Sequence, residues 1–156
     1  KAIVGGKPST SEKRGIPWLV FGTAITLLLG GGFFLFMATQ NSDWSSNISA
    51  VVPWIPLILI NAAINAFGEE ATFRAAPLAT LIPAIGQTHA LWLTSIWFGL
   101  GHYYGGIPSG LFGFFQTGLI ALIMGKAMLD TRGIALPWMI HMILDTIIYF
   151  FIAATM

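Results

Sequence analysis

Charged side chains are scarce in this chain, and cysteine is absent. Asp, Glu, Lys and Arg together make up 8% of its 156 residues, whereas a soluble domain carries about 25%. Without cysteine the chain can form no disulfide and no thiolate site. Its formal net charge of +1 gives no reason to expect a nucleic-acid partner. Hydrophobic residues account for 56% of the sequence, which predicts a protein whose main partner is the lipid bilayer.

Apolar segments of helical length predict an all-α fold, a polytopic transmembrane helix bundle with about five spans. A helix needs about 20 apolar residues to cross the hydrocarbon core. The second span starts near residue 51 and runs through Arg74, and Pro77 and Pro83 are expected to break or kink it. The other predicted spans comprise residues 17–38, 89–104, 111–129 and 136–156.

The placement of Lys and Arg predicts the orientation of the spans. Residues 39–50 and 105–110, which form loops on one side, contain neither Lys nor Arg. Cytoplasmic loops carry an excess of these residues. A cytoplasmic N-terminus puts the following basic residues inside: Lys1, Lys7, Lys13, Arg14, Lys126 and Arg132. We therefore expect a multi-pass protein of the cell membrane with its N-terminus in the cytoplasm.

Two adjacent glutamates, Glu69 and Glu70, interrupt a long uncharged stretch of the chain. Ionisable groups at bilayer depth cost several kcal/mol unless they are paired or line a cavity. Glu70 and Arg74 are four residues apart, so they share a helix face and are predicted to form a structural ion pair. Glu69 points about 100° away from Glu70 and shares its face with Phe73. Glu69 is therefore the better candidate for a catalytic residue.

Two histidines stand in the later spans. His102 closes the third span, and Phe98, one turn before it, is placed to stack on its ring. Glu69 and His102 are nearly symmetric about the turn at residues 84–86, so a simple antiparallel hairpin puts them at the same depth. His141 and Asp145 share one face of the fifth span, where the carboxylate can hold the ring in one tautomer. Straight helices put His141 short of this depth, so a tilt, a kink or an in-plane segment is needed to bring it there.

Three segments, taken in order, resemble the motifs of a known family. They read Glu69-Glu70-Ala71-Thr72-Phe73-Arg74, Phe98-Gly99-Leu100-Gly101-His102 and His141-Met142-Ile143-Leu144-Asp145. They are similar to the EExxxR, FxxxH and Hxxx(D/N) motifs of the CPBP family, also called Abi, which comprises CAAX proteases and bacteriocin-processing enzymes. The resemblance covers residues 51–156, the expected catalytic transmembrane domain. Residues 1–50 are expected to form a basic N-terminal segment, the first span and an outside loop.

The resemblance implies an intramembrane endopeptidase related to the type II CAAX prenyl endopeptidases, acting on a membrane-associated peptide or protein. It assigns activation of water to Glu69 with help from His102, and stabilisation of the oxyanion to His141 and Asp145. The prenyl endopeptidase branch has asparagine at the position of Asp145, and an ionised aspartate cannot donate a hydrogen bond. Asp145 therefore either carries a proton or only orients His141.

Other mechanisms and functions stay open at this stage. No metal is expected, but Glu69, His102, His141 and Asp145 are all acceptable zinc ligands, so zinc is the alternative cofactor. Against zinc, the chain has no HExxH pair and no two histidines on one helix face. The alternative functions are a non-catalytic bacteriocin self-immunity protein and a proton- or ion-coupled membrane component.

Overall fold

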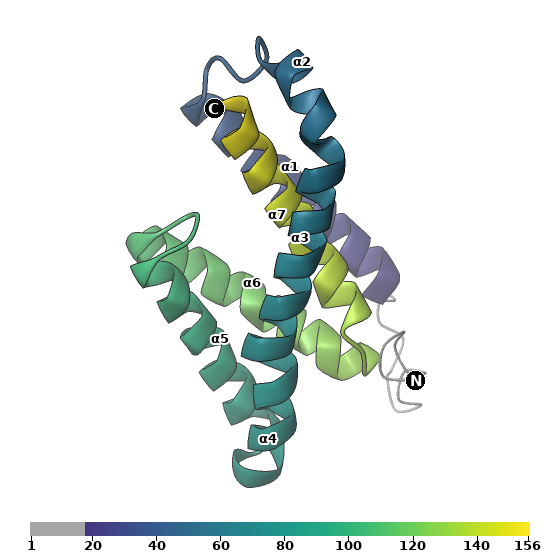
Figure 1. Ribbon diagram of the computed structural model, residues 1–156. Helices are drawn as coiled ribbons and strands as arrows, with labels where there is room; N and C mark the ends of the chain where they lie inside the picture. Colours follow the sequence, from purple (N-terminus) through teal and green to yellow (C-terminus); the bar gives the residue numbers. More distant parts are fainter. Residues whose placement is uncertain (1–17) are drawn as a thin grey trace. The chain divides into compact units, whose positions relative to one another are not determined.

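The computed structural model describes residues 18–156, and every regular element in that range is helical. The elements in chain order are α1 (Trp18–Gln40), α2 (Ile48–Val51), the 3-10 turn η1 (Val52–Trp54), α3 (Ile55–Glu69), the π-helix η2 (Glu70–Ala75), α4 (Ala76–Ile85), α5 (Gln87–Tyr104), α6 (Gly110–Thr131) and α7 (Ala135–Ala154) (Figure 1). The predicted all-α membrane fold is confirmed. The basic residues that precede the first span lie outside the described range.

Within residues 18–156, four helical segments are long and apolar enough to cross a membrane: Val20–Gln40, Ile48–Ile85, Gly110–Thr131 and Ala135–Ala154. They match the predicted first, second, fourth and fifth spans, so the chain is a multi-pass membrane protein. The third predicted span is the 18-residue helix α5, which is not among these four. Its glycines and its Gln, Thr, Ser and His side chains lower its mean hydropathy. The cytoplasmic position of the N-terminus stays a prediction.

The second span does not break at either proline. Helical winding continues from Ile48 to Ile85 and changes from α to π over η2. The π turn ends with the N–H of Ala76 bonded to the carbonyl of Ala71. Pro77 then falls in the first turn of α4, directly after the π turn, where the fixed φ of proline suits a helix. The helix stops after Ile85, because Gly86 adopts φ +81°, a conformation that side chains other than glycine rarely adopt.

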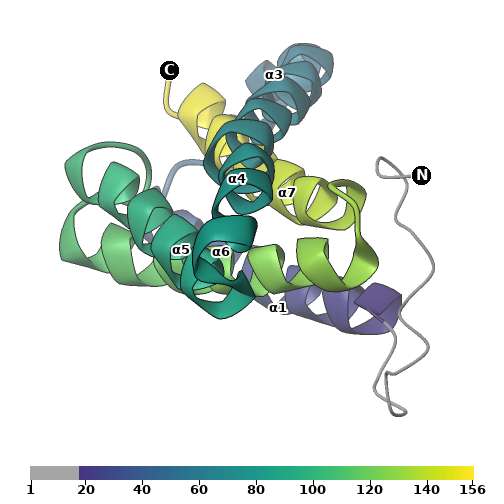
Figure 2. The same cartoon turned by 90° about the horizontal axis from the view of Figure 1, so that it is seen from below.

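The described chain divides into two compact units. The first comprises Gly68–Pro137, so it holds η2, α4, α5 and α6. Helices α5 and α6 lie side by side in both views (Figures 1 and 2). Their backbones approach closely at Gly99, where a Cβ would lie 2.7 Å from the carbonyl oxygen of Phe114. A small apolar core also connects α4, α5 and α6. Each helix contributes one buried residue to it: Leu78, Ala90 and Met128.

The second unit contains α1, α2, η1, most of α3, and α7 from Trp138 onward. Val51, Ile58 and Ala154 form its core together with aromatic residues of α7. Two long-range hydrogen bonds tie α7 to this unit. The indole N–H of Trp138 donates to the carbonyl of Ala63 over 2.9 Å, and the amide of Asn47 donates to the carbonyl of Ala154 over 2.8 Å. Helix α7 is thus held near both of its ends, with His141 and Asp145 between the two bonds.

Candidate active site

The two adjacent glutamates belong to different helical segments. Glu69 is the last residue of α3, and Glu70 is the first residue of the π-helix η2. Glu70 is 0% exposed and Arg74 is 2% exposed, and their side chains form an ion pair between Oε1 and Nη1. A buried charge needs such a partner, since an isolated ion inside a protein is strongly destabilising. This pair occupies the position that helical spacing predicts.

Arg74 also ties η2 to α5. Its guanidinium carbon lies 5.2 Å from the ring centroid of Phe98, within the range of an attractive cation–π contact. Its side-chain stem passes Gly125 of α6, where a Cβ would lie 3.6 Å from the Cδ of Arg74. Phe98 itself is 4% exposed. One side chain therefore braces the start of η2 against the centre of α5.

Phe98 in turn supports His102. The two ring centroids are 4.8 Å apart, and Nδ1 of His102 lies 3.3 Å from the carbonyl oxygen of Phe98. A carbonyl oxygen only accepts hydrogen bonds, so this contact puts the ring proton on Nδ1. In the neutral ring, Nε2 is then a hydrogen-bond acceptor. The contact between Phe98 and His102 that the motif spacing suggests is present, but the two rings are tilted by 45° rather than stacked in parallel.

Glu69 and His102 line the same cavity, whose volume is about 240 Å³. Its other lining residues are Phe73, Phe98, Gly101, Gly105 and Gly106. Liquid water occupies about 30 Å³ per molecule, so the cavity has room for water beside a small polar group. A carboxylate and an imidazole facing one such space are suited to general acid–base chemistry.

The loop after α5 closes over His102 at Gly106. A Cβ at this position would lie 3.0 Å from Cδ2 and 3.4 Å from Nε2 of His102, and Gly106 has φ +95°. Both the positive φ and the close approach favour glycine, because any other residue adds a Cβ against the ring. No pattern in the sequence predicted a role for Gly106 at His102.

A second polar cluster lies in the second unit. His141 and Asp145 of α7 are each 6% exposed, and Nε2 of His141 is 3.6 Å from Oδ1 of Asp145. The other carboxylate oxygen, Oδ2, accepts a hydrogen bond of 3.1 Å from Nδ2 of Asn65 in α3. Both oxygens of Asp145 therefore face nitrogen atoms. This is the arrangement expected if Asp145 orients His141 rather than donating a proton itself.

Asn65 is a member of this cluster that sequence reasoning missed. The available signal was an asparagine in an apolar span, one helical turn before Glu69. His89 belongs to neither cluster. It is exposed, and its Nδ1 lies 3.1 Å from the carbonyl oxygen of Ile85. Glu69 and His102 are thus brought together in the first unit, and His141 and Asp145 in the second. The depth of His141 relative to His102 stays a prediction.

Within each unit, the described residues include no group of three or more His, Asp or Glu side chains that could hold a metal ion. Catalytic zinc sites use three protein ligands, and each of the two clusters supplies only two of the four predicted ligands. The zinc alternative stays untested.

Comparison with known proteins identifies a family that matches most of the chain. Residues 50–147 match the type II CAAX prenyl endopeptidase Rce1-like family. This range contains all three motifs, the cavity shared by Glu69 and His102, and the cluster around Asp145. No curated protein and no solved structure matches the chain. Because the match covers more than half of its residues, the chain belongs to the type II CAAX prenyl endopeptidase Rce1-like family, a family of membrane proteases.

Proposed function

We propose that the protein is an intramembrane endopeptidase that hydrolyses a peptide bond in a membrane-associated peptide or protein. Glu69 and His102 activate the attacking water. The observation that carries the proposal is the cavity of about 240 Å³ that both side chains line. A carboxylate that only stabilised the helix would not need to face such a space beside an imidazole.

The reaction follows from the chemistry of these two groups. Glu69 takes a proton from water as the water oxygen bonds to the carbonyl carbon of the substrate. His102 holds the same water through Nε2, since Nδ1 is directed to the carbonyl of Phe98. As the C–N bond breaks, the proton passes to the leaving amine. A positioned acid or base of this kind contributes about 10²–10⁴-fold in rate.

His141 stabilises the oxyanion in this proposal, and Asp145 holds the histidine ring. The Nε2 atom of His141 lies 3.6 Å from Oδ1 of Asp145, so the carboxylate orients the ring. A ring N–H of histidine is the kind of donor that an oxyanion needs. Removing one donor from an oxyanion hole typically costs about 10²–10³-fold in kcat.

The test is cleavage of a transmembrane peptide by the purified protein in detergent, followed by mass spectrometry. Glu69→Gln keeps the shape of the side chain and removes the base, so we expect kcat to fall by about 10²–10⁴-fold. Asp43→Asn is the matched control, because Asp43 is an exposed acid outside both clusters. Full cleavage by Glu69→Gln would refute the role of Glu69. Protection against a bacteriocin that survives this variant, with no cleaved product, would instead support the self-immunity alternative.

A further inference from the structure

Asn65 holds the carboxylate of Asp145 from a second helix. We propose that Asn65 is a positioning residue that fixes the orientation of Asp145 and, through it, that of His141. The effect on the ring of His141 follows from the geometry of this cluster alone. The effect on catalysis rests on the function proposed above.

The contact joins two distant parts of the sequence within one unit. Asn65 of α3 and Asp145 of α7 are 80 residues apart, and Nδ2 of Asn65 donates to Oδ2 of Asp145 over 3.1 Å. Helix α7 is also bonded to α3 two residues before Asn65, where the indole of Trp138 donates to the carbonyl of Ala63. The hydrogen bond at Ala63 therefore fixes the backbone near Asn65 against α7. This fixed backbone positions the side chain of Asn65 next to Asp145.

A carboxylate needs two contacts to keep its orientation. The last torsion of an aspartate side chain is broad and roughly two-fold, so one contact leaves the group free to swing. Asn65 fixes Oδ2, which leaves Oδ1 facing Nε2 of His141 at 3.6 Å. This separation is longer than a good hydrogen bond, so the contact with the ring depends on the direction in which Oδ1 points. The amide of Asn65 supplies one fixed point for that direction.

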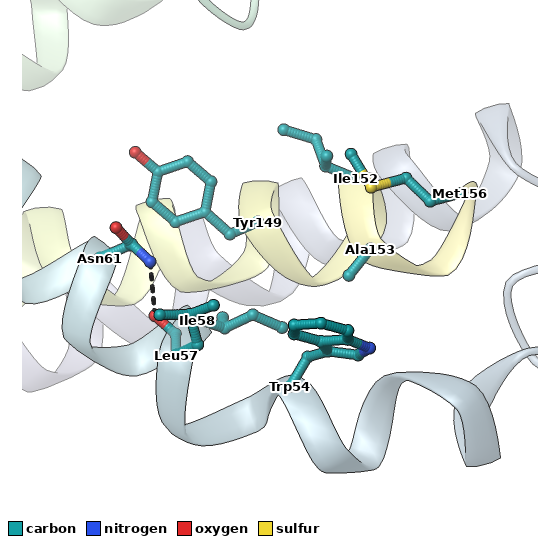
Figure 3. Close-up of a pocket in the computed structure, with 8 residues that line it drawn as sticks. All are labelled: Trp54, Leu57, Ile58, Asn61, Tyr149, Ile152, Ala153 and Met156. Atoms are coloured by element: carbon teal, nitrogen blue, oxygen red, sulfur yellow. Dashed lines mark hydrogen bonds between the residues drawn. The ribbon is translucent and has the colours of Figure 1, made fainter.

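The neighbouring asparagine of the same helix behaves differently. Asn61, one turn before Asn65, is exposed, and its Nδ2 donates to the carbonyl of Leu57 in its own helix over 2.9 Å. Figure 3 shows this bond, with Asn61 at the edge of an apolar groove of about 500 Å³ that α3 and α7 line. Asparagine side chains commonly bond to nearby backbone in this way. Asn65 bonds to a buried acid of another helix, whereas the bond of Asn61 to Leu57 stays within its own helix, so Asn61 is a matched control.

Asn65 also bears on the charge of the cluster. A buried carboxylate is tolerated only when hydrogen-bond donors or a counter-ion compensate it. Asn65 donates to one oxygen of Asp145, and Nε2 of His141 faces the other.

The experiment observes the histidine rings directly. The full chain, labelled with ¹⁵N-histidine, is purified in detergent, and the ring nitrogens of its three histidines are recorded by NMR. His141→Gln identifies the signals of His141. We expect Asn65→Leu to shift or split these signals while those of His89 and His102 stay in place. Asn61→Leu should leave all three histidines unchanged. Unchanged His141 signals in a folded Asn65→Leu protein, or an equal change in Asn61→Leu, would overturn the inference.

A second set of variants tests the same contact if Asn65→Leu does not fold. Asn65→Asp puts two carboxylates at the distance of the present hydrogen bond, and we expect the thermal midpoint to fall. Adding Asp145→Asn reverses donor and acceptor, so the double variant should regain most of that loss. A double variant no more stable than Asn65→Asp would contradict the contact. Neither this measurement nor the NMR experiment depends on proteolysis, so both remain decisive if the proposed function fails.

The catalytic part has its own readout. We expect Asn65→Leu to lower kcat by about 10–100-fold, the usual effect of removing a partner that orients a functional histidine, with KM nearly unchanged. Asn61→Leu should keep the wild-type kcat. A normal kcat in a variant whose His141 signals have moved would refute the catalytic role of His141, while the positioning by Asn65 would stand.

Discussion

One methyl group at Gly106 tests whether the loop after α5 sets the position of His102. In Gly106→Ala the new Cβ would lie 3.0 Å from Cδ2 of His102, so the ring must move by a few tenths of an ångström. The φ of +95° adds backbone strain, about 1–3 kcal/mol for a residue other than glycine. Misplacing a catalytic group by about 1 Å costs roughly 10²-fold in rate. We therefore expect about a tenfold fall in kcat together with a lower thermal midpoint.

A glycine of α1 provides the control. Gly32 is exposed and does not line the cavity, and a Cβ there meets no atom within 4 Å. Gly32→Ala should therefore keep kcat close to wild type without lowering the thermal midpoint. Cleavage of a transmembrane peptide gives kcat and KM, and thermal unfolding in detergent gives stability. Equal kcat values for the two variants would refute the idea that Gly106 sets the position of His102.

Two further predictions concern the ion pair and the cofactor. Arg74→Met leaves the charge of Glu70 buried without its counter-ion, so we expect a loss of about 3–5 kcal/mol in unfolding free energy. Adding Glu70→Leu should recover most of that loss, because an apolar pair of similar volume often replaces a buried ion pair at little cost. A double variant as unstable as the single one in denaturant unfolding would contradict this account. For the metal-free mechanism, prolonged treatment with a chelator should leave peptide cleavage unchanged. Activity that is lost on chelation and restored by zinc would establish the zinc alternative.

Local spacing predicted most of what lies within one helix or one hairpin. Residues four apart on a helix are neighbours, and this rule paired Glu70 with Arg74 and Phe98 with His102. The turn before Gly86 predicted that Glu69 and His102 come together, since two helices joined by a short turn run antiparallel. The helical period and the position of a turn are enough for these two predictions, and the sequence contains both.

Contacts between helices that are distant in the sequence could not be predicted in this way. The bond from Asn65 to Asp145 depends on how far α3 and α7 are rotated about their axes, and hydropathy does not specify that rotation. Gly106 was missed because its approach to His102 depends on the path of an irregular loop. The change to π winding at Glu70 was also missed. Pro77 and Pro83 suggested a break or kink in the span. In the structure the helix continues, and Pro77 lies in the first turn of α4.

The π winding of η2 also bears on how this span can change in evolution. A π turn holds one residue more than an α turn. Deleting one residue from Glu70–Ala75 would restore ordinary α winding and leave both flanking segments facing as they do now. A one-residue deletion in α6 would instead rotate every later side chain by about 100° and turn buried positions toward lipid. The extra residue of this span falls beside the ion pair of Glu70 and Arg74. Removing a residue between these two would keep the direction in which Glu69 faces but would change their four-residue spacing.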